Sequence, residues 1–279
     1  MRKGDELMGT LRRAAAILSA AIILMAFSAQ GSFAATISLA MSMTINANPD
    51  SFTVTVHLEN QGDAPAHDVS ALLSILDKRL ASNPIQRLLP KKPINITYFQ
   101  KMGEMPKGSF PAILLVDYHD ESGYAFSALH SAAFDTKPDI KTDMVVEAKS
   151  AEISQKAVLV LNMQNPGDRA RDFRVRLILP REFSGRDRDR VFLLDSKEQK
   201  KLEFDVVNLS ALVGASYPAC FVVEYDEDYV HHTVVADARM TVVAKASWFA
   251  RTRALWWIFL GFCVLGVLVA TLRRGRAGT

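Results

Sequence analysis

Apolar and polar residues alternate with a period of two along most of the chain between residues 37 and 243. Successive Cβ atoms of a strand point to opposite faces, so this pattern predicts strands with one buried face and an all-β protein. Strands are expected at 37–45, 51–59, 68–76, 94–101, 112–119, 124–133, 144–148, 156–164, 172–179, 191–194, 200–207, 219–226 and 229–243. A weaker edge strand is expected at 85–89, and the segments 81–89 and 209–213 are candidates for helical turns.

Two parts of the sequence occur twice. The segment 109–118, SFPAILLVDY, is followed 107 residues later by 216–225, SYPACFVVEY. The segment 54–63, VTVHLENQGD, is matched by 159–168, LVLNMQNPGD, at an offset of 105. About 100 residues make one compact β-sandwich. We therefore predict two tandem immunoglobulin-like β-sandwiches, at 36–135 and 139–245, separated by the linker-like stretch 135–139.

The repeated residues have expected roles in folding. The Asn and Gly of the shared turn are expected to supply the positive φ of a tight turn. Pro111 and Pro218 are expected at the first residue of a strand, because proline has no backbone donor. The alternating strand followed by an Asn-x-Gly turn resembles the CARDB and NEW3 type of bacterial and archaeal immunoglobulin-like domains. In the turns, Asn60, Gly62 and Ala66 have the usual spacing of that family; Asn165, Gly167 and Ala170 are one residue short. The resemblance implies an extracytoplasmic adhesion or accessory module and transfers no catalytic residue.

The first 34 residues have the pattern of a signal peptide. Arg12 and Arg13 precede an apolar stretch, and Ser32-Phe33-Ala34 offers small residues where a signal peptidase cleaves. Cleavage is expected after Ala34. Met8 is an alternative start, which would remove two acidic residues from the leader.

The C-terminal part predicts a membrane anchor. Residues 254–272 contain no charge, and at about 1.5 Å per residue they reach roughly 28 Å, close to the thickness of the hydrocarbon layer. The residues expected at the two membrane interfaces are Trp248, Trp256, Trp257, Arg273 and Arg274. With the leader exported, the chain is predicted to be a single-pass protein of a bacterial inner membrane. Its sandwiches would lie in the periplasm, with 273–279 as a cytoplasmic tail.

Charge and cysteine content narrow the function. Nine of the 33 basic residues and two of the 30 acidic residues lie in the leader or beside the apolar segment, which leaves 24 against 28 and a net charge of −4 for the exported part. This balance gives no electrostatic basis for nucleic-acid binding. Cys220 and Cys263 cannot form a disulfide, because Cys263 lies within the predicted span. Cys220 is expected to be a small buried apolar residue.

Few residues suggest site chemistry. His231 and His232 are neighbours in a predicted strand and therefore point to opposite faces, which disfavours one shared metal ion. Acidic residues gather where the last hairpin of each copy turns: Asp120 and Glu121 in the first, and Asp226, Glu227 and Asp228 in the second. These loop tips are candidate contact sites, with Ca²⁺ binding as one alternative and simple solvation as the other.

The segment 184–190 alternates Arg and Asp. It fits a solvated edge that discourages strand pairing, with a docking surface for an acidic partner as the alternative. No nucleophile elbow, phosphate-binding glycine loop or zinc-ligand spacing occurs, and we expect no catalytic residue, cofactor or metal.

These observations predict a noncatalytic, membrane-tethered interaction module, an accessory subunit of a transporter or envelope-assembly complex. An envelope glycan-binding or adhesion module is the first alternative. Glycan binding requires exposed aromatic side chains. The exported part offers only Tyr and Phe for this role, because all three Trp lie just before or at the start of the apolar segment. A hydrolase that uses the acidic tips, with Asp226 as the test residue, is the second.

Overall fold

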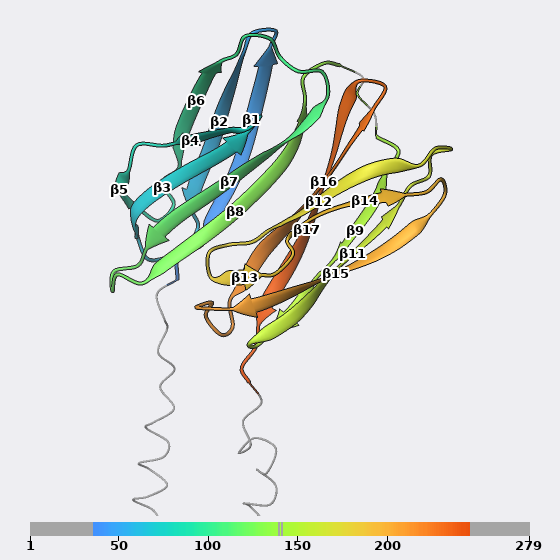
Figure 1. Ribbon diagram of the computed structural model, residues 1–279. Helices are drawn as coiled ribbons and strands as arrows, with labels where there is room; N and C mark the ends of the chain where they lie inside the picture. Colours follow the sequence, from blue (N-terminus) through green and yellow to red (C-terminus); the bar gives the residue numbers. More distant parts are fainter. Residues whose placement is uncertain (1–35, 139, 141, 246–279) are drawn as a thin grey trace, which may run out of the picture. The chain divides into compact units, whose positions relative to one another are not determined.

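The computed structural model describes residues 36–245 except 139 and 141 (Figure 1). This part of the chain consists of seventeen β-strands joined by turns and loops, and it contains no helix. Among these residues no helix is therefore long and apolar enough to cross a bilayer. The predicted signal peptide, the apolar segment 254–272 and its flanking Trp and Arg residues lie outside the described residues.

The first eight strands form two sheets, which we name the N-terminal sheet pair. One sheet has the order β1-β2-β6; the other has the order β4-β3-β7-β8, with β5 also paired to β3. In immunoglobulin nomenclature these sheets contain strands A-B-E and C-F-G. The strands are β1 (Leu39–Asn48), β2 (Ser51–Asn60), β3 (Ala66–Ile75), β4 (Lys78–Ala81), β5 (Ile85–Leu88), β6 (Ile94–Lys101), β7 (Ser109–His119) and β8 (Ala125–Asp135).

The remaining strands form the C-terminal sheet pair with the same arrangement. Its sheets have the orders β13-β15-β11-β9 and β10-β17-β16-β12-β14, with β10 parallel to β17 and the other pairs antiparallel. The strands are β9 (Val145–Lys149), β10 (Ala151–Ile153), β11 (Lys156–Gln164), β12 (Arg171–Ile178), β13 (Phe183–Gly185), β14 (Asp189–Leu194), β15 (Gln199–Asn208), β16 (Ser216–Glu227) and β17 (Val230–Val242). The described chain is thus all-β and built of immunoglobulin-like sandwiches.

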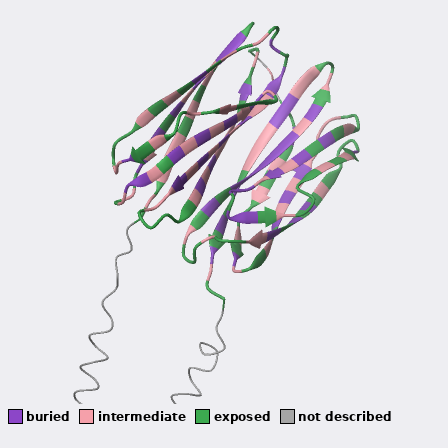
Figure 2. Cartoon of the chain, turned by 60° about the vertical axis from the view of Figure 1, so that its left-hand side comes forward, coloured by how far each residue is buried: buried purple, intermediate pink, exposed green. Residues whose placement is uncertain are grey.

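Each sheet pair encloses its own apolar core. In β2 the side chains of Phe52, Val54, Val56 and Leu58 are fully buried, while the residues between them are not. The predicted alternation is confirmed in most strands, as the banded colouring of Figure 2 shows. The second core centres on the large buried side chains Phe173, Phe204, Phe221, Leu159, Leu161 and Leu194.

All of the predicted strands are observed, and three short strands were missed. The observed β6 and β11 have the predicted bounds, and the other predicted strands shift by a few residues at their ends. The short strands β4, β10 and β13 were not predicted, because three or four residues are too few to show a period. The helical turns considered at 81–89 and 209–213 are wrong: the first segment includes β5, and the second is a non-helical loop.

The two prolines lie inside their strands and not at the first residue. Each is the third residue, Pro111 in β7 and Pro218 in β16. Pairing of β7 with β3 ends at Ala112, and pairing of β16 with β12 ends at Cys220. Each proline therefore lies where its strand has a partner on one side only, so the missing N–H leaves no gap in a ladder.

The repeated Asn-x-Gly segment has a different role from the one expected. None of Asn60, Gly62, Asn165 and Gly167 has a positive φ. The segment joins strands of different sheets, so no hairpin geometry is required there. Instead the Asn side chain is fully buried in both copies and holds the loop.

The bonds of the two asparagines match. Asn60 Nδ2 donates to Ala64 O at 2.7 Å and to Leu88 O at 3.3 Å, and its Oδ1 accepts from Gly62 N at 3.0 Å. Asn165 makes the same three bonds, to Arg169 O at 2.8 Å, to Leu194 O at 3.1 Å and from Gly167 N at 3.2 Å. Structure as well as sequence therefore supports a duplication.

Candidate functional site: the groove between the sheet pairs

One sheet of each pair contributes to an apolar contact between the pairs. Leu129 of β8 packs with Cys220 and Val222 of β16, and all three are buried; Ile113, Ile178 and Val235 surround them. Burial raises the pKa of the Cys220 thiol to about 12, so it is a neutral, apolar group. The prediction of a small buried apolar residue at this position is confirmed.

A buried carboxylate fastens the two pairs beside this contact. Glu182 is only 2% exposed. Its two oxygens accept hydrogen bonds from the backbone N and the hydroxyl of Ser127 in β8, both at 2.6 Å. The same hydroxyl accepts a bond from Arg181 N at 2.8 Å, and the Arg181 side chain pairs with Asp117 of β7 at 2.6 Å. We call Ser127, Glu182, Arg181 and Asp117 the clasp.

His231 forms a second attachment at the start of β17. Its backbone N donates to Lys107 O at 3.2 Å, and the residue forms a parallel bridge with Gly108. Its ring stacks on Phe110, with centroids 4.7 Å apart and planes 12° apart. A Cβ at Gly108 would lie 2.4 Å from His231 O, so only glycine allows this approach.

The His231 ring also lies between two carboxylates. Nδ1 is 2.8 Å from Asp226 Oδ1, and Nε2 is 3.4 Å from Glu224 Oε1. The hydrogen bond with Glu224 raises the pKa of His231, burial opposes this, and Asp226 adds to the increase. Burial by itself would raise the pKa of Glu224, but bonds from His231 and from Arg176, at 2.8 Å, lower it overall.

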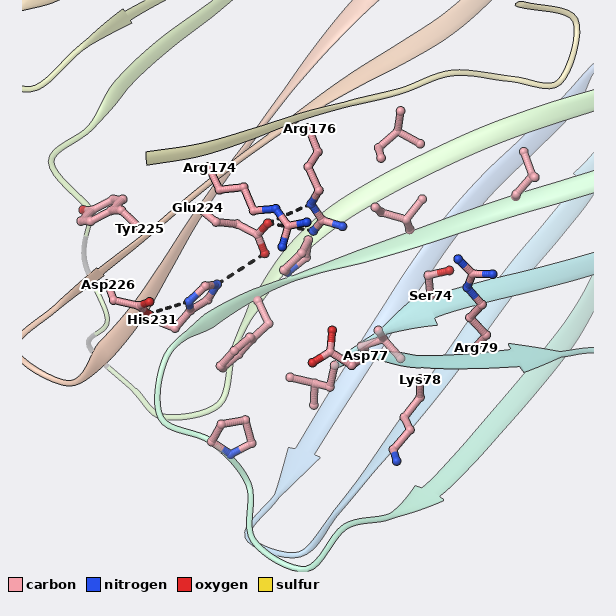
Figure 3. A pocket seen from close by; sticks show the side chains of 18 of the residues that line it. Ser74, Asp77, Lys78, Arg79, Arg174, Arg176, Glu224, Tyr225, Asp226 and His231 are labelled. Atoms are coloured by element: carbon pink, nitrogen blue, oxygen red, sulfur yellow. Dashed lines mark hydrogen bonds and ion pairs between the residues drawn. The ribbon is translucent and has the colours of Figure 1, made fainter. Parts of the chain in front are cut away.

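Next to this network a groove of about 1080 Å³ lies between the sheet pairs (Figure 3). Residues of β3, β4 and β7 line one side, and residues of β12, β14 and β16 line the other. Its apolar lining includes Leu72, Leu115, Leu129, Ile178 and Val191. Binding sites commonly combine an apolar lining of this kind with a few placed polar groups.

Four cationic side chains line the groove, two from each pair. Arg174 pairs with Asp189 at 2.5 Å and Arg176 with Glu224. Lys78 and Arg79 form no ion pair within the part of the chain that the structure describes. The Asp189 hydrogen bond raises the pKa of Arg174, and Asp77 adds a smaller contribution, although it belongs to the other sheet pair. The groove therefore has an apolar interior and a charged rim, on which the cations Lys78 and Arg79 and the acids Asp77 and Asp172 form no ion pair within the described residues.

The predicted loop-tip residues do not form one site. In the first hairpin, Asp120 Oδ1 accepts bonds from the backbone and hydroxyl of Ser122 and from Tyr124 N, which lower the pKa of its carboxyl. Its role there is to fix the turn, and Glu121 next to it is exposed.

The acidic residues at the tip of the second hairpin also form contacts or shape the turn. Asp226 bonds to His231, and Glu227 pairs with the Arg171 guanidinium at 2.8 Å. Asp228 adopts a positive φ of 50° in the turn. These three acidic residues line a second hollow of about 530 Å³ with Lys107 and Tyr229. His231 and His232 do point apart, because the ring of His232 stacks on Tyr225.

Among residues 36–245, leaving out 139 and 141, no group of three or more His, Cys, Asp or Glu side chains is arranged to hold a metal ion. The alternating segment 184–190 is largely engaged with its neighbours: Arg190 donates to Asp187 O and Glu203 O, and Asp189 pairs with Arg174.

No protein-family model and no curated protein matches the chain. Solved structures show distant similarity. Native alpha-2-macroglobulin of Escherichia coli is 11% identical with a TM-score of 0.32, over 75% of this chain and 17% of that one. Red sea bream transglutaminase is 14% identical with a TM-score of 0.24, over 75% and 31%. Salmonella alpha-2-macroglobulin reacted with methylamine is 12% identical with a TM-score of 0.29, over 75% and 16%. The chain spans less than a third of each, and the fold assignment rests on the strand order described above.

The groove was not predicted from the sequence. The acid that precedes Tyr in the repeated segment was a signal in each copy: Glu224 lines the groove, and its counterpart Asp117 belongs to the clasp. Both lie on the outer face of their strand, where alternation alone predicts contact with solvent. In the structure each meets an arginine: Asp117 pairs with Arg181 of the other sheet pair, and Glu224 pairs with Arg176 beside the groove.

Proposed function

We propose that this protein is a noncatalytic interaction module that lies outside the cytoplasm and is tethered by the apolar segment 254–272. It acts as an accessory subunit of a transporter or envelope-assembly complex. The observation that carries the proposal is the groove, whose sides come from both sheet pairs. A surface of this kind exists only while both pairs are held together, and the clasp, the His231 attachment and the apolar contact hold them.

The chemistry of the groove favours a protein partner. An apolar centre with a polar rim is the usual composition of a protein–protein interface. The free cations Lys78 and Arg79 on the rim would attract carboxylates of the partner and raise its rate of association. A simple spacer between membrane and envelope would need neither feature.

Purification of the full chain in mild detergent tests the proposal. A discrete partner is expected at stoichiometric yield. The double variant Lys78→Glu, Arg79→Glu reverses the free positive charges of the rim and is expected to reduce that yield by about tenfold or more. The matched control, Lys149→Glu with Lys156→Glu, reverses two exposed charges on β9 and β11, away from the groove, and should keep the partner. Absence of a stoichiometric partner, or equal loss in both variants, would contradict the proposal.

A further inference from the structure

The outer face of the β1-β2-β6 sheet has an unusual composition. The register aligns four rows of residues of this face across the strands; three of them, next to the terminal row Asn48-Ser51-Lys101, contain nine outward residues. These three rows are Ser42-His57-Asn95, Thr44-Thr55-Thr97 and Asn46-Thr53-Phe99. None of these nine is an acid, lysine or arginine; the charged residues of this face, Lys101 and Glu59, lie at its two ends. We call these nine residues the neutral face.

The other copy of the fold gives an internal comparison. The residues of β11 equivalent to Thr53, Thr55 and His57 are Val158, Val160 and Asn162, and their rows are Val158-Asp205, Lys149-Val160-Glu203 and Glu147-Asn162-Lys201. Five of these eight residues are charged, and Lys201 pairs with Glu203 at 2.6 Å. Both faces are formed by strands of the same fold, so strand propensity alone does not account for three successive rows without a charge.

The neutral face has free hydrogen-bonding groups. Within the described residues the hydroxyls of Thr44, Thr53, Thr55 and Thr97 form no hydrogen bond, while His57 and Asn95 bond to each other at 3.0 Å. Strands lie about 4.8 Å apart and residues of one face about 6.8 Å apart along a strand, so the hydroxyls form a nearly regular grid. A grid of this kind can donate to and accept from the hydroxyls of a ligand without removing any charge from water.

An exposed aromatic completes the array. Phe99 at one corner is 66% exposed, although it lies in a strand where burial of an aromatic ring would be favourable. A ring in this position offers an apolar surface beside the hydroxyl grid. The combination suits a ligand that presents hydroxyls along its edges and C–H groups on its faces, which is the chemistry of a sugar ring.

We infer that the neutral face binds an uncharged polysaccharide, with Phe99 stacking on a sugar ring and the Thr and Asn side chains bonding to its hydroxyls. This site lies on different strands from those that line the groove and is independent of the protein partner proposed above. It assigns residues to glycan binding, which the sequence had offered only as an alternative function.

Binding of defined sugars by the full chain tests this inference. The chain is kept in a zwitterionic detergent, because alkyl glycoside detergents would themselves present sugars. The probes are a β-linked glucose hexasaccharide, a β-linked N-acetylglucosamine hexasaccharide and, as the charged counterpart, an oligogalacturonate. At least one neutral probe is expected to bind, and more tightly than the charged one.

Variants locate the binding. Phe99→Ala and Thr55→Lys are each expected to weaken binding by about tenfold or more, while Phe99→Trp should retain it. The control Val160→Lys changes the equivalent position of the other copy and should leave binding unchanged. The inference is overturned if neither neutral hexasaccharide binds, or if Thr55→Lys and Val160→Lys have the same effect.

Discussion

At the residue scale, His231 has the most consequential position. It is the one residue that contacts Gly108 and Phe110 of the N-terminal pair as well as Glu224 and Asp226 of its own. Because the surrounding carboxylates raise the pKa of its imidazole, folding favours the protonated form. Its contribution to stability is therefore complete below the unfolded pKa of about 6.5 and is lost as the pH rises through the higher folded pKa.

This linkage predicts a pH-dependent effect of His231→Gln. The loss of thermal stability in the variant should be largest below about pH 6.5 and should shrink as the pH rises above it. Thermal unfolding of the full chain in detergent across this range measures it. The control Thr233→Val removes a nearby bond to Ser109 O, of 2.8 Å, that involves no titratable group, and should act equally at every pH. A constant difference between the wild type and His231→Gln would contradict the assignment.

The duplicated asparagines show how much a residue pattern predicts. The repeat identified Asn60 and Asn165 as equivalent, and the structure confirms it by matching hydrogen bonds. Their role could not be read from the sequence, because the carbonyl acceptors of Leu88 and Leu194 lie 28 and 29 residues further along. Local turn chemistry was the only available interpretation, and the absence of a positive φ shows that it was wrong.

At the scale of elements, alternation predicted the long strands because a buried face imposes a period of two over eight or more residues. It failed for β4, β10 and β13, which are too short to show a period and are defined by their partners. The need for a glycine just before β7 could not be predicted from the sequence either. Gly108 has a φ of 153°, and its need for glycine comes from His231, which lies 123 residues away in the chain.

This contact predicts that Gly108→Ala destabilises the protein. The added Cβ would clash with the backbone of His231, and we expect a loss of at least about 1 kcal/mol in the free energy of unfolding, measured by chemical denaturation. The control Gly103→Ala introduces a methyl group with no atom within 4 Å and should have little effect. Equal stability of the Gly108 variant and the wild type would contradict the close contact between Gly108 and His231.

At the scale of the molecule, the sequence predicted the two sandwich units but gave no information about how they pack. The residues of the clasp are polar, and Arg181 and Glu182 lie outside the predicted strands, so no pattern in the sequence predicts their contacts. The burial of Glu182, which is 2% exposed, depends on its contact with Ser127 of the other sheet pair. The groove follows from this packing, and with it the proposal of a shared binding surface.

Crosslinking in intact cells from a position in the groove tests that proposal most directly. A photoreactive residue at Val191, which is 70% exposed and lines the groove, is compared with one at Val158, which is 44% exposed on β11 of the other sheet. We predict a discrete adduct with an envelope or membrane protein from position 191 and none from position 158. No adduct from position 191, or the same adducts from both positions, would contradict a partner-binding role for the groove.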